Sequence, residues 1–311
     1  MTVIEASAPG RCGIIGNPTD IYGGRVLSCS VPARATCRLT LGVHDQLPDD
    51  LRLWDAATAR FPIKNVKVEW SSEIPKSSGL AGSTALLAAT LACVMTATGH
   101  EPALATPTDR IEFAELLRDV ELNEAGVVCG YQDAYMITHG GLQAMDFKGK
   151  HPIHSGPYGT LVQLSLEDNP FLLVTTGVER LSGSVHGPMR DRWLAGDSEV
   201  VDAMAHLKSL ANFAIEAFIL RDWDEFALAM TENQRVVSDL GGSGKAIDSL
   251  IQDCLRCGAM AAKLAGAGMG GTVIALAKDV EELSSNLDRI GRTAQMRPMP
   301  TNGVVISQIS T

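Results

Sequence analysis

Residues 75–90 read PKSSGLAGSTALLAAT, a polar loop that runs directly into a helix rich in alanine and leucine. Gly79 and Gly82 let the backbone adopt positive φ, and Ser83 and Thr84 are residue types that cap helices. The free N–H groups of the first helical turn then point outward together, where the helix dipole places about half a positive charge. We expect this loop to bind an anion such as phosphate. An ordinary capped helix after a surface loop is the alternative.

The anion must be held by local positive groups, because the chain as a whole is acidic. Its formal net charge is −10 at pH 7, which argues against nucleic acid as a partner. Lys76, just upstream of the loop, supplies a compact positive charge. No run of about 18 to 20 apolar residues is present, and the start MTVIEASAPGR is not a signal peptide. We therefore expect a cytoplasmic protein with no membrane partner.

The length and the cysteines indicate a reduced, well-packed protein. A chain of 311 residues with 45% apolar composition can form two domains or one large one. Seven cysteines among apolar neighbours are typical of buried thiols rather than of disulfides. Cys254 and Cys257 form a single CxxC, which without a second pair argues against a zinc site.

The first forty residues contain short strand-like runs around a loop of turn-forming residues, Gly16–Gly24. Arg11, Asn17, Asp20 and Tyr22 in or beside this loop are types that hydrogen-bond a polyhydroxylated ligand, although ordinary turn chemistry also explains them. The expected strands are Val3–Ala6, Cys12–Ile15, Val26–Val31, Thr36–Leu41 and, further on, Val66–Trp70.

Two carboxylates stand out in the segment that follows. A helix capped by Thr108 and ended by Gly126 places Glu121 near its C-terminus, where the helix dipole disfavours negative charge. A magnesium ion would explain that position, and a solvated side chain at a frayed end is the alternative. Asp133 lies inside an apolar helix, where a carboxylate is either paired or functional.

The second half begins after a basic loop rich in proline and glycine at 148–158, which predicts a domain boundary and hence domains of 1–155 and 156–311. Arg190 and Arg192 lie near a flexible Ser/Gly turn, so they could hold an anionic substrate group or remain solvated. The elements expected here are strands at 161–166, 171–176, 260–266, 272–277 and 303–309 and helices at 197–220, 223–239, 244–257 and 280–292.

Two glycine-rich strings fail the tests for common cofactor loops. GGSGK at 241–245 lacks the first glycine and the final Ser or Thr of a P-loop. GAGMGG at 266–271 is followed by a strand rather than a helix, so it does not match a dinucleotide fingerprint. A strand, glycine loop and strand instead provide a surface that another loop can approach closely.

Three separated segments together resemble the ordered motifs of the GHMP small-molecule kinases: APGRCGIIGNPTD, PKSSGLAGSTALLAA and KLAGAGMGGTVIAL. The similarity spans nearly the whole chain, and the forms GNPTD, GLAGSTAL, GVVCGYQDAY and SVHGPMRDRWLAGD resemble the glucuronokinase branch, which phosphorylates a uronic acid at its anomeric hydroxyl. The resemblance implies an α+β fold of two domains, mixed sheets covered by helices, and an active site in the interdomain cleft.

The resemblance also implies roles for single residues. Ser83 and Glu121 would bind Mg²⁺, and Asp133 would face the substrate hydroxyl. Asn17-Pro18 stands where galactokinase has Glu-His, which makes galactose specificity doubtful. The phosphates of ATP would lie against Lys76, Ser78, Gly79, Leu80, Ala81, Gly82, Ser83 and Thr84; Gly266, Gly268, Gly270 and Gly271 would brace that loop; and Arg11, Asn17 and Asp20 would bind the substrate. From their residue types and positions, Tyr22 and Arg190 are further expected substrate ligands.

The expected activity is transfer of the γ-phosphoryl group of ATP to a sugar or sugar acid, in a monomer or homodimer. Two alternatives stay open. One is a kinase of the same superfamily that acts on a non-sugar alcohol, such as mevalonate or homoserine. The other is a sensor that binds ligand without turnover, against which the intact set of Ser83, Glu121 and Asp133 argues.

Overall fold

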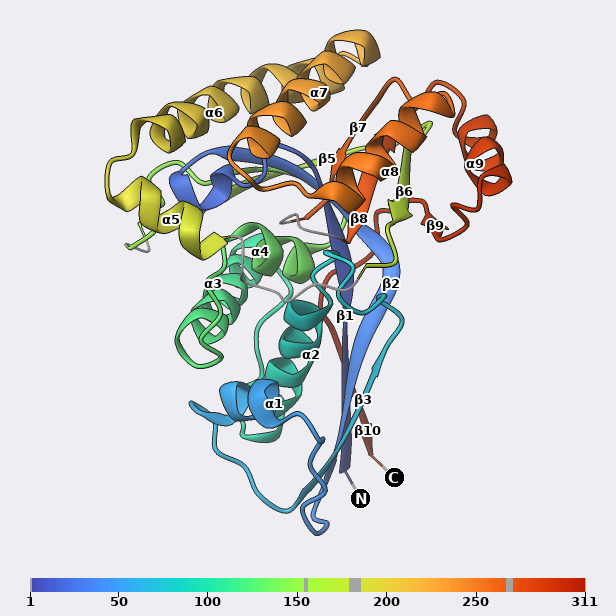
Figure 1. Ribbon diagram of the computed structural model, residues 1–311. Coiled ribbons are helices and arrows are strands. Elements are labelled where there is room, and N and C mark those ends of the chain that lie inside the picture. Colours follow the sequence, from blue (N-terminus) through green and yellow to red (C-terminus); the bar gives the residue numbers. More distant parts are fainter. Residues whose placement is uncertain (1, 154–155, 179–185, 267–270, 311) are drawn as a thin grey trace.

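The computed structural model describes residues 2–153, 156–178, 186–266 and 271–310, and its strands form two antiparallel sheets (Figure 1). The first sheet has the order β10-β1-β2-β4-β5, with β3 also paired to β2, and the second has the order β7-β8-β6-β9. The strands are β1 (Thr2–Ile15), β2 (Arg25–Leu41), β3 (Val66–Ser72), β4 (Leu142–Asp146), β5 (Thr160–Leu164), β6 (Phe171–Thr175), β7 (Ala261–Leu264), β8 (Thr272–Leu276), β9 (Gln295–Met296) and β10 (Val305–Ser310).

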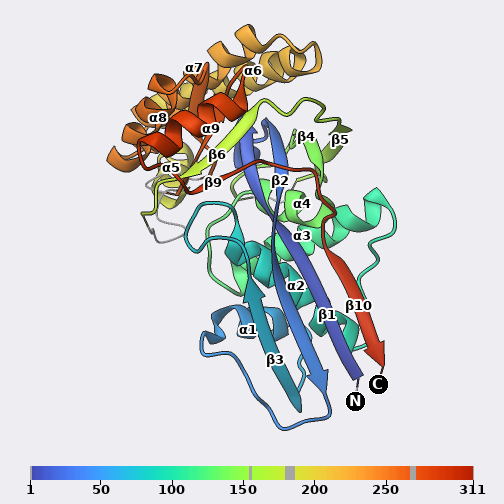
Figure 2. The same cartoon turned by 90° about the vertical axis from the view of Figure 1, so that its right-hand side faces the viewer.

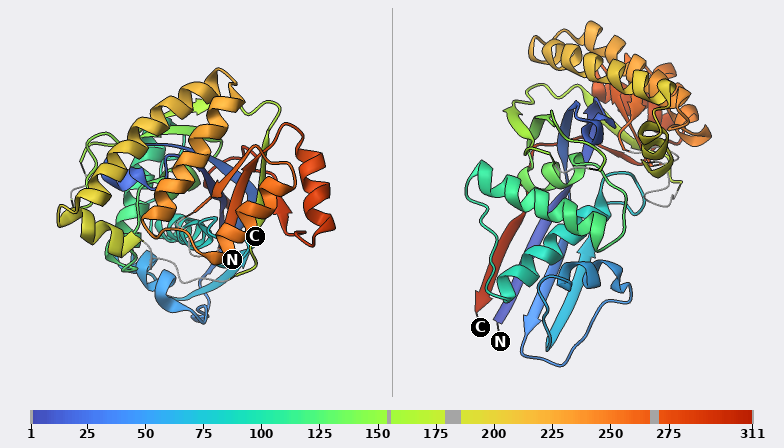
Figure 3. Two further views of the ribbon diagram at one scale, coloured as in Figure 1. Left: turned by 45° about the horizontal axis from the view of Figure 1, so that its top comes forward. Right: turned by 90° about the vertical axis from the view of Figure 1, so that its left-hand side faces the viewer.

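The long strands β1 and β2 form the centre of the molecule, and the expectation of four short strands there was wrong. Residues 26–31 of β2 are all buried, whereas from Pro32 to Leu39 buried positions alternate with more exposed ones. A strand buried on both faces reads as a continuous apolar run, and one with a solvated face alternates. The outer half of the sheet is accordingly bare on one face (Figure 2) and covered by helices on the other (Figure 3, right).

Four helices belong to the first sheet: α1 (Leu51–Thr58), α2 (Gly82–Ala97), α3 (Pro107–Asn123) and α4 (Gln132–His139). Helix α2 packs directly on β1 and β2, and twelve of its sixteen residues are buried. A helix that is apolar all round is expected in the core, which is why this segment shows no polar face. The sequence missed α1, although Asp50 caps it by accepting the amide of Arg52.

Further helices come from the second half of the chain, and some of them pack on the second sheet. These are α5 (His186–Leu194), α6 (Ser198–Ile219), α7 (Trp223–Asp239), α8 (Lys245–Arg256) and α9 (Val280–Arg289). The last four match the expected helices within a few residues. Helix α5 was expected to be part of a flexible turn, and that prediction was wrong. Seen from above, α6 and α7 run side by side across the top of the molecule (Figure 3, left).

The sheets do not divide at residue 155, because β5 and β10 both join the first sheet. The division into domains of 1–155 and 156–311 stays a prediction, and the α+β class is confirmed. All seven cysteines are free thiols, as expected. In the parts of the chain that the structure describes, each helix is too short or too polar to span a lipid bilayer.

Candidate active site

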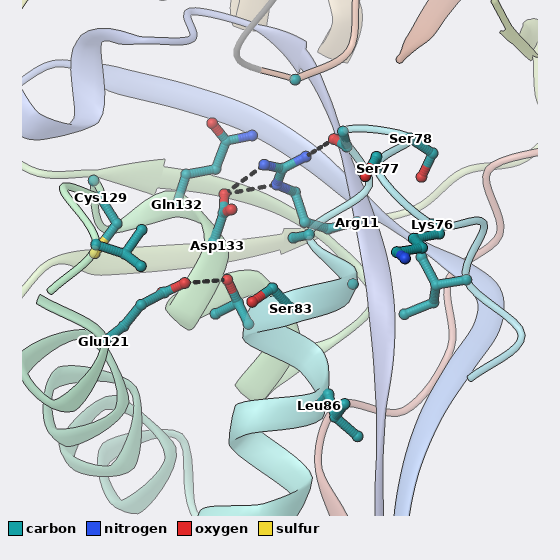
Figure 4. Close-up of a pocket in the computed structure, with 18 of the residues that line it drawn as sticks. Arg11, Lys76, Ser77, Ser78, Ser83, Leu86, Glu121, Cys129, Gln132 and Asp133 are labelled. Carbon is teal, nitrogen blue, oxygen red and sulfur yellow. Dashed lines mark hydrogen bonds and ion pairs between the residues drawn. The ribbon is translucent and has the colours of Figure 1, made fainter. Parts of the chain in front are cut away.

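A cavity of about 660 Å³ brings together most of the predicted site residues. Its walls come from the β1 end, the loop before α2, the end of α3 and the start of α4 (Figure 4). The predicted residues that line it are Arg11, Asn17, Asp20, Lys76, Ser78, Gly79, Ala81, Gly82, Ser83, Thr84, Glu121, Asp133 and Gly266.

The loop before α2 has left-handed residues at alternate positions, namely Ser77, Gly79 and Ala81, with φ of 56°, 77° and 59°. Gly82 was predicted to have positive φ and does not, because it is the first helical residue. Ser83 was expected to cap the helix together with its neighbour, and this was also wrong: Ala81 occupies the N-cap position and offers no side-chain hydrogen bond. Among the described residues no side chain caps the first amides of α2, and these amides lie at the cavity, as an anion site requires.

Other atoms of this loop fit an anionic ligand as well. The Ser78 hydroxyl is buried without a hydrogen-bond partner among the described residues, although Ser78 lines the cavity. Lys76 is exposed at the cavity rim. Leu80 does not line the cavity; its side chain is in the core and its carbonyl accepts the backbone N–H of Arg11 at 3.0 Å.

The second-half glycine loop packs on this backbone at both of its described ends. A Cβ on Gly266 would lie 2.5 Å from the Gly79 carbonyl oxygen, and one on Gly271 would lie 2.5 Å from that of Ser78. Only glycine fits such an approach. Gly268 and Gly270 lie outside the described residues.

Asp133, at the second position of α4, is tied to the phosphate loop through Arg11. Its Oδ1 accepts from Arg11 Nε at 2.7 Å and contacts Nη2 at 2.6 Å, while Arg11 Nη1 donates to the Gly79 carbonyl at 2.7 Å (Figure 4). The side chain of Asp133 is 28% exposed and that of Arg11 is 7% exposed. Since Arg11 occupies Oδ1, the second oxygen of Asp133 remains available to a ligand.

Glu121 is buried in the last turn of α3, and its partner is Thr84 rather than Ser83. Thr84 Oγ1 donates to Glu121 Oε1 at 2.7 Å (Figure 4). Burial raises the pKa of Glu121 to about 7, and the nearby charge of Asp133 adds to the rise. The described residues contain no cluster of three His, Cys, Asp or Glu side chains suited to a metal. Because of their hydrogen bond, Thr84 and Glu121 nevertheless place two hard oxygen donors side by side. Ser83 lines the same cavity.

Two predicted substrate ligands also hold the site together. Asp20 Oδ2 accepts the backbone amides of Tyr131 at 2.6 Å and Gln132 at 2.9 Å, so it caps α4 from more than a hundred residues away. Asn17 Oδ1 accepts from Lys263 Nζ at 2.8 Å, and its Nδ2 donates to the Gly266 carbonyl at 3.3 Å. Both side chains still reach the cavity wall.

Tyr22, Arg190 and Arg192 are not among the residues that line the cavity. Tyr22 is buried against Trp193, with ring centroids 5.4 Å apart. Arg190 pairs with its neighbour Asp191, and Arg192 of α5 pairs with two carboxylates at the start of α6, those of Asp197 and Glu199. The structure therefore does not bring Tyr22 and Arg190 together with the other predicted ligands.

The sequence missed part of the wall. Asp50, Arg52 and Leu53 reach the cavity from the start of α1, and Gln132 and Cys129 reach it from either side of Tyr131. The signal for α1 was present, since Asp50 is a cap residue followed by the apolar Leu51, Leu53 and Trp54.

Models of known families match the chain over the same regions. The GHMP kinases N terminal domain matches residues 51–141, and GHMP kinases C terminal matches residues 214–292. The galactokinase galactose-binding signature matches residues 3–39.

Similar individual proteins extend over most of the chain. Probable glucuronokinase 2 and glucuronokinase 1 of Arabidopsis thaliana are each 27% identical, covering 86% and 85% of this chain and 82% and 83% of their own length. Among solved structures, Lactococcus lactis galactokinase with galactose has a TM-score of 0.77 at 18% identity, covering 97% of this chain and 95% of that one. Family, fold and cavity agree: the chain belongs to the GHMP kinases and is an ATP-dependent kinase with their two-domain fold.

Proposed function

We propose that this kinase transfers the γ-phosphoryl group of ATP to a hydroxyl of a sugar or uronic acid, the anomeric hydroxyl of a uronic acid above all. The observation that carries the proposal is that Asp133, Glu121 and the uncapped start of α2 line one cavity. The similarity to two glucuronokinases supports the class of substrate.

Different residues would bind the phosphates of ATP and activate the substrate hydroxyl. The amides that open α2, the Ser78 hydroxyl and Lys76 would bind the phosphates of ATP. Arg11 fixes one oxygen of Asp133, so the other would accept a hydrogen bond from the substrate hydroxyl and take up its proton as the new P–O bond forms. In phosphoryl transfer, such positioning and charge neutralisation supply most of the rate enhancement.

A magnesium ion fits the donors present. Mg²⁺ prefers oxygen ligands and is commonly held by one or two protein groups together with substrate phosphates. Thr84 Oγ1 and Glu121 Oε1 are 2.7 Å apart at the cavity wall. We propose that these two residues would hold the ion, in place of the predicted pair of Ser83 and Glu121. When bound, the ion would neutralise phosphate charge.

The test of the chemistry is Asp133→Asn, which keeps the shape and removes the proton acceptor. We expect the turnover number to fall at least a thousandfold while ATP binding, measured by calorimetry, changes less than threefold. Activity within about tenfold of wild type would remove Asp133 from the proton transfer. The substrate is tested by screening ATP consumption with neutral sugars, uronates, mevalonate and homoserine; turnover with only the last two would contradict the proposed sugar specificity.

A further inference from the structure

Lys263 is a fully buried lysine beside the cavity wall. Its Nζ donates to Asn17 Oδ1 and to the Leu264 carbonyl, both at 2.8 Å, and both acceptors are neutral. It makes no ion pair with a carboxylate of the described residues. Fully buried ammonium groups are rare unless they are paired. The charged form of Lys263 therefore has no counter-charge among the residues that the structure describes.

Lys263 also fixes the orientation of Asn17. An ammonium group only donates, so the side-chain oxygen of Asn17 must face it and the NH₂ group must face away. One N–H of that group reaches the Gly266 carbonyl, and the other makes no hydrogen bond to a described residue. Asn17 lines the cavity. The NH₂ group of Asn17 thus offers a hydrogen-bond donor at the cavity wall, and the ammonium group of Lys263 lies behind Asn17, bonded to its side-chain oxygen.

Lys76 and Arg52 line the cavity without an ion pair to a described residue, but both are exposed to solvent, which screens their charge, and Lys76 is assigned to the phosphates of ATP. Arg11, Lys150 and Arg190 are already neutralised. Arg11 binds Asp133 and the Gly79 carbonyl. Lys150, behind the start of α4, is paired with Glu115 at 2.6 Å. Arg190 lies off the cavity and pairs with its own neighbour. An anionic group of the substrate would therefore gain more from the wall at Asn17 than from these positions.

We propose that Asn17 and Lys263 form the subsite for an anionic group of the substrate, which in a uronic acid is the carboxylate. This inference rests on the proposed function, which it narrows to acidic sugars. Asn17 donates its free N–H to the carboxylate, and Lys263 supplies the counter-charge from behind.

The electrostatics around Lys263 give the subsite a pH dependence. Burial lowers the pKa of Lys263 to about 7, with the nearby Arg11 lowering it and Cys12 raising it. The charged form exists below that pKa, and an anion bound at Asn17 stabilises it. The affinity for a uronate should consequently fall as the pH rises through 7, by up to tenfold for each pH unit.

The experiment compares glucuronate with glucose, which differ in the carboxylate, by calorimetry in the presence of a non-hydrolysable ATP analogue. Wild-type protein should lose glucuronate affinity between pH 6.5 and 8.5 while its glucose affinity stays within threefold. Asn17→Asp supplies Lys263 with an internal partner and repels the carboxylate, so the preference for glucuronate over glucose should fall at least tenfold. Asn212→Asp, which adds the same charge on the exposed face of α6, should leave that preference unchanged.

The outcomes separate this inference from the proposed function. Equal pH profiles for the two sugars, or a wild-type preference for glucose, would overturn the subsite even if glucose is phosphorylated. Glucuronate binding with the expected pH profile but without phosphoryl transfer would support the subsite and contradict the proposed function. If Asn17→Asp does not fold, Lys263→Met serves instead and should flatten the pH profile for glucuronate.

Discussion

The carboxylate of Asp20 links the first loop of the chain to the helix that carries Asp133. It accepts two amides at the start of α4, where the helix dipole favours a negative charge. Gly130 makes this approach possible, because a Cβ there would lie 2.0 Å from Asp20 Oδ2. Asp20 is thus foremost a positioning residue, even though a sugar-binding role was the reason for predicting it.

Gly130→Ala should break this link. We expect the free energy of unfolding to fall by about 2–4 kcal/mol, since the cap is lost and the site is overpacked. Turnover should fall at least tenfold because Asp133 lies three residues further on. The control is Gly187→Ala in α5, where an added Cβ meets nothing within 4 Å, and stability there should change by less than about 0.5 kcal/mol. Chemical denaturation and steady-state kinetics measure both effects, and equal stabilities of the two variants would contradict this account.

At the level of single residues, the sequence predicted which residues belong to the site better than it predicted their hydrogen-bond partners. The resemblance to the GHMP kinases predicted that Arg11, Glu121 and Asp133 belong to one site, and all three line the cavity. The partner of Glu121 was harder to predict, because it depends on where α2 begins. That start follows a left-handed alanine, Ala81, in a conformation that the sequence pattern assigns to glycine.

Among the helices, α3 shows how a capping signal decides a boundary. The predicted cap was Thr108, but the structure uses Thr106, whose Oγ1 accepts the amide of Asp109 while Asp109 bonds back to the Thr106 amide. Pro107 occupies the first helical position, which suits a residue without an N–H. This reciprocal arrangement is a capping box, and it places the helix start two residues earlier than expected.

Thr106→Ala should lower the free energy of unfolding by about 1 kcal/mol, the usual cost of removing a cap. Thr108→Ala should change it by less than about 0.5 kcal/mol, because Thr108 is exposed inside the first turn. Urea denaturation of the two variants compares the two candidate caps directly. A larger loss for Thr108→Ala would restore the original prediction.

Periodicity and caps predicted the existence of most helices and strands, but not their continuity. β1 and β2 run through glycine and proline positions that the sequence suggested as breaks. Pro9 and Gly13 pair with Arg34 and Ser28 across the ladder, and shifts in register between Pro9 and Arg11 and between Gly13 and Ile15 let the strands continue. α5 was read as a turn from its flanking Ser and Gly residues, whereas its tertiary contacts with α6 support a helix. Tertiary packing overrides local signals of this kind.

Across the whole molecule, Asn233 of α7 joins the two halves of the chain. It is fully buried, its Oδ1 accepts the Gly16 amide at 2.9 Å, and its Nδ2 donates to the Asn17 carbonyl at 3.2 Å. Asn233→Ala should therefore leave two buried backbone groups unpaired and cost about 2–4 kcal/mol of stability. Asn212→Ala, an exposed asparagine on α6, should cost less than about 0.5 kcal/mol. Similar thermal and chemical stabilities of the two variants would show that the Asn233 contacts do not hold the halves together.

Contacts between residues so far apart in the sequence could not be predicted from the sequence alone. The resemblance to a kinase family predicted that the phosphate loop before α2 and the second-half glycine loop meet, but not the bond from Lys263 to Asn17. Neither residue belongs to a local pattern that names its partner. Such pairs depend on how the two sheets dock, which periodicity does not encode.

The pairing of β10 with β1 has a consequence for biosynthesis. Thr2 lies opposite Ser310 in the register, so the two ends of the chain are neighbours (Figures 1 and 2). During translation, the outer edge of β1 has no neighbouring strand until β10 (Val305–Ser310) has also left the ribosome. Until then the nascent chain carries an open strand edge, which could pair with the edge strand of another chain.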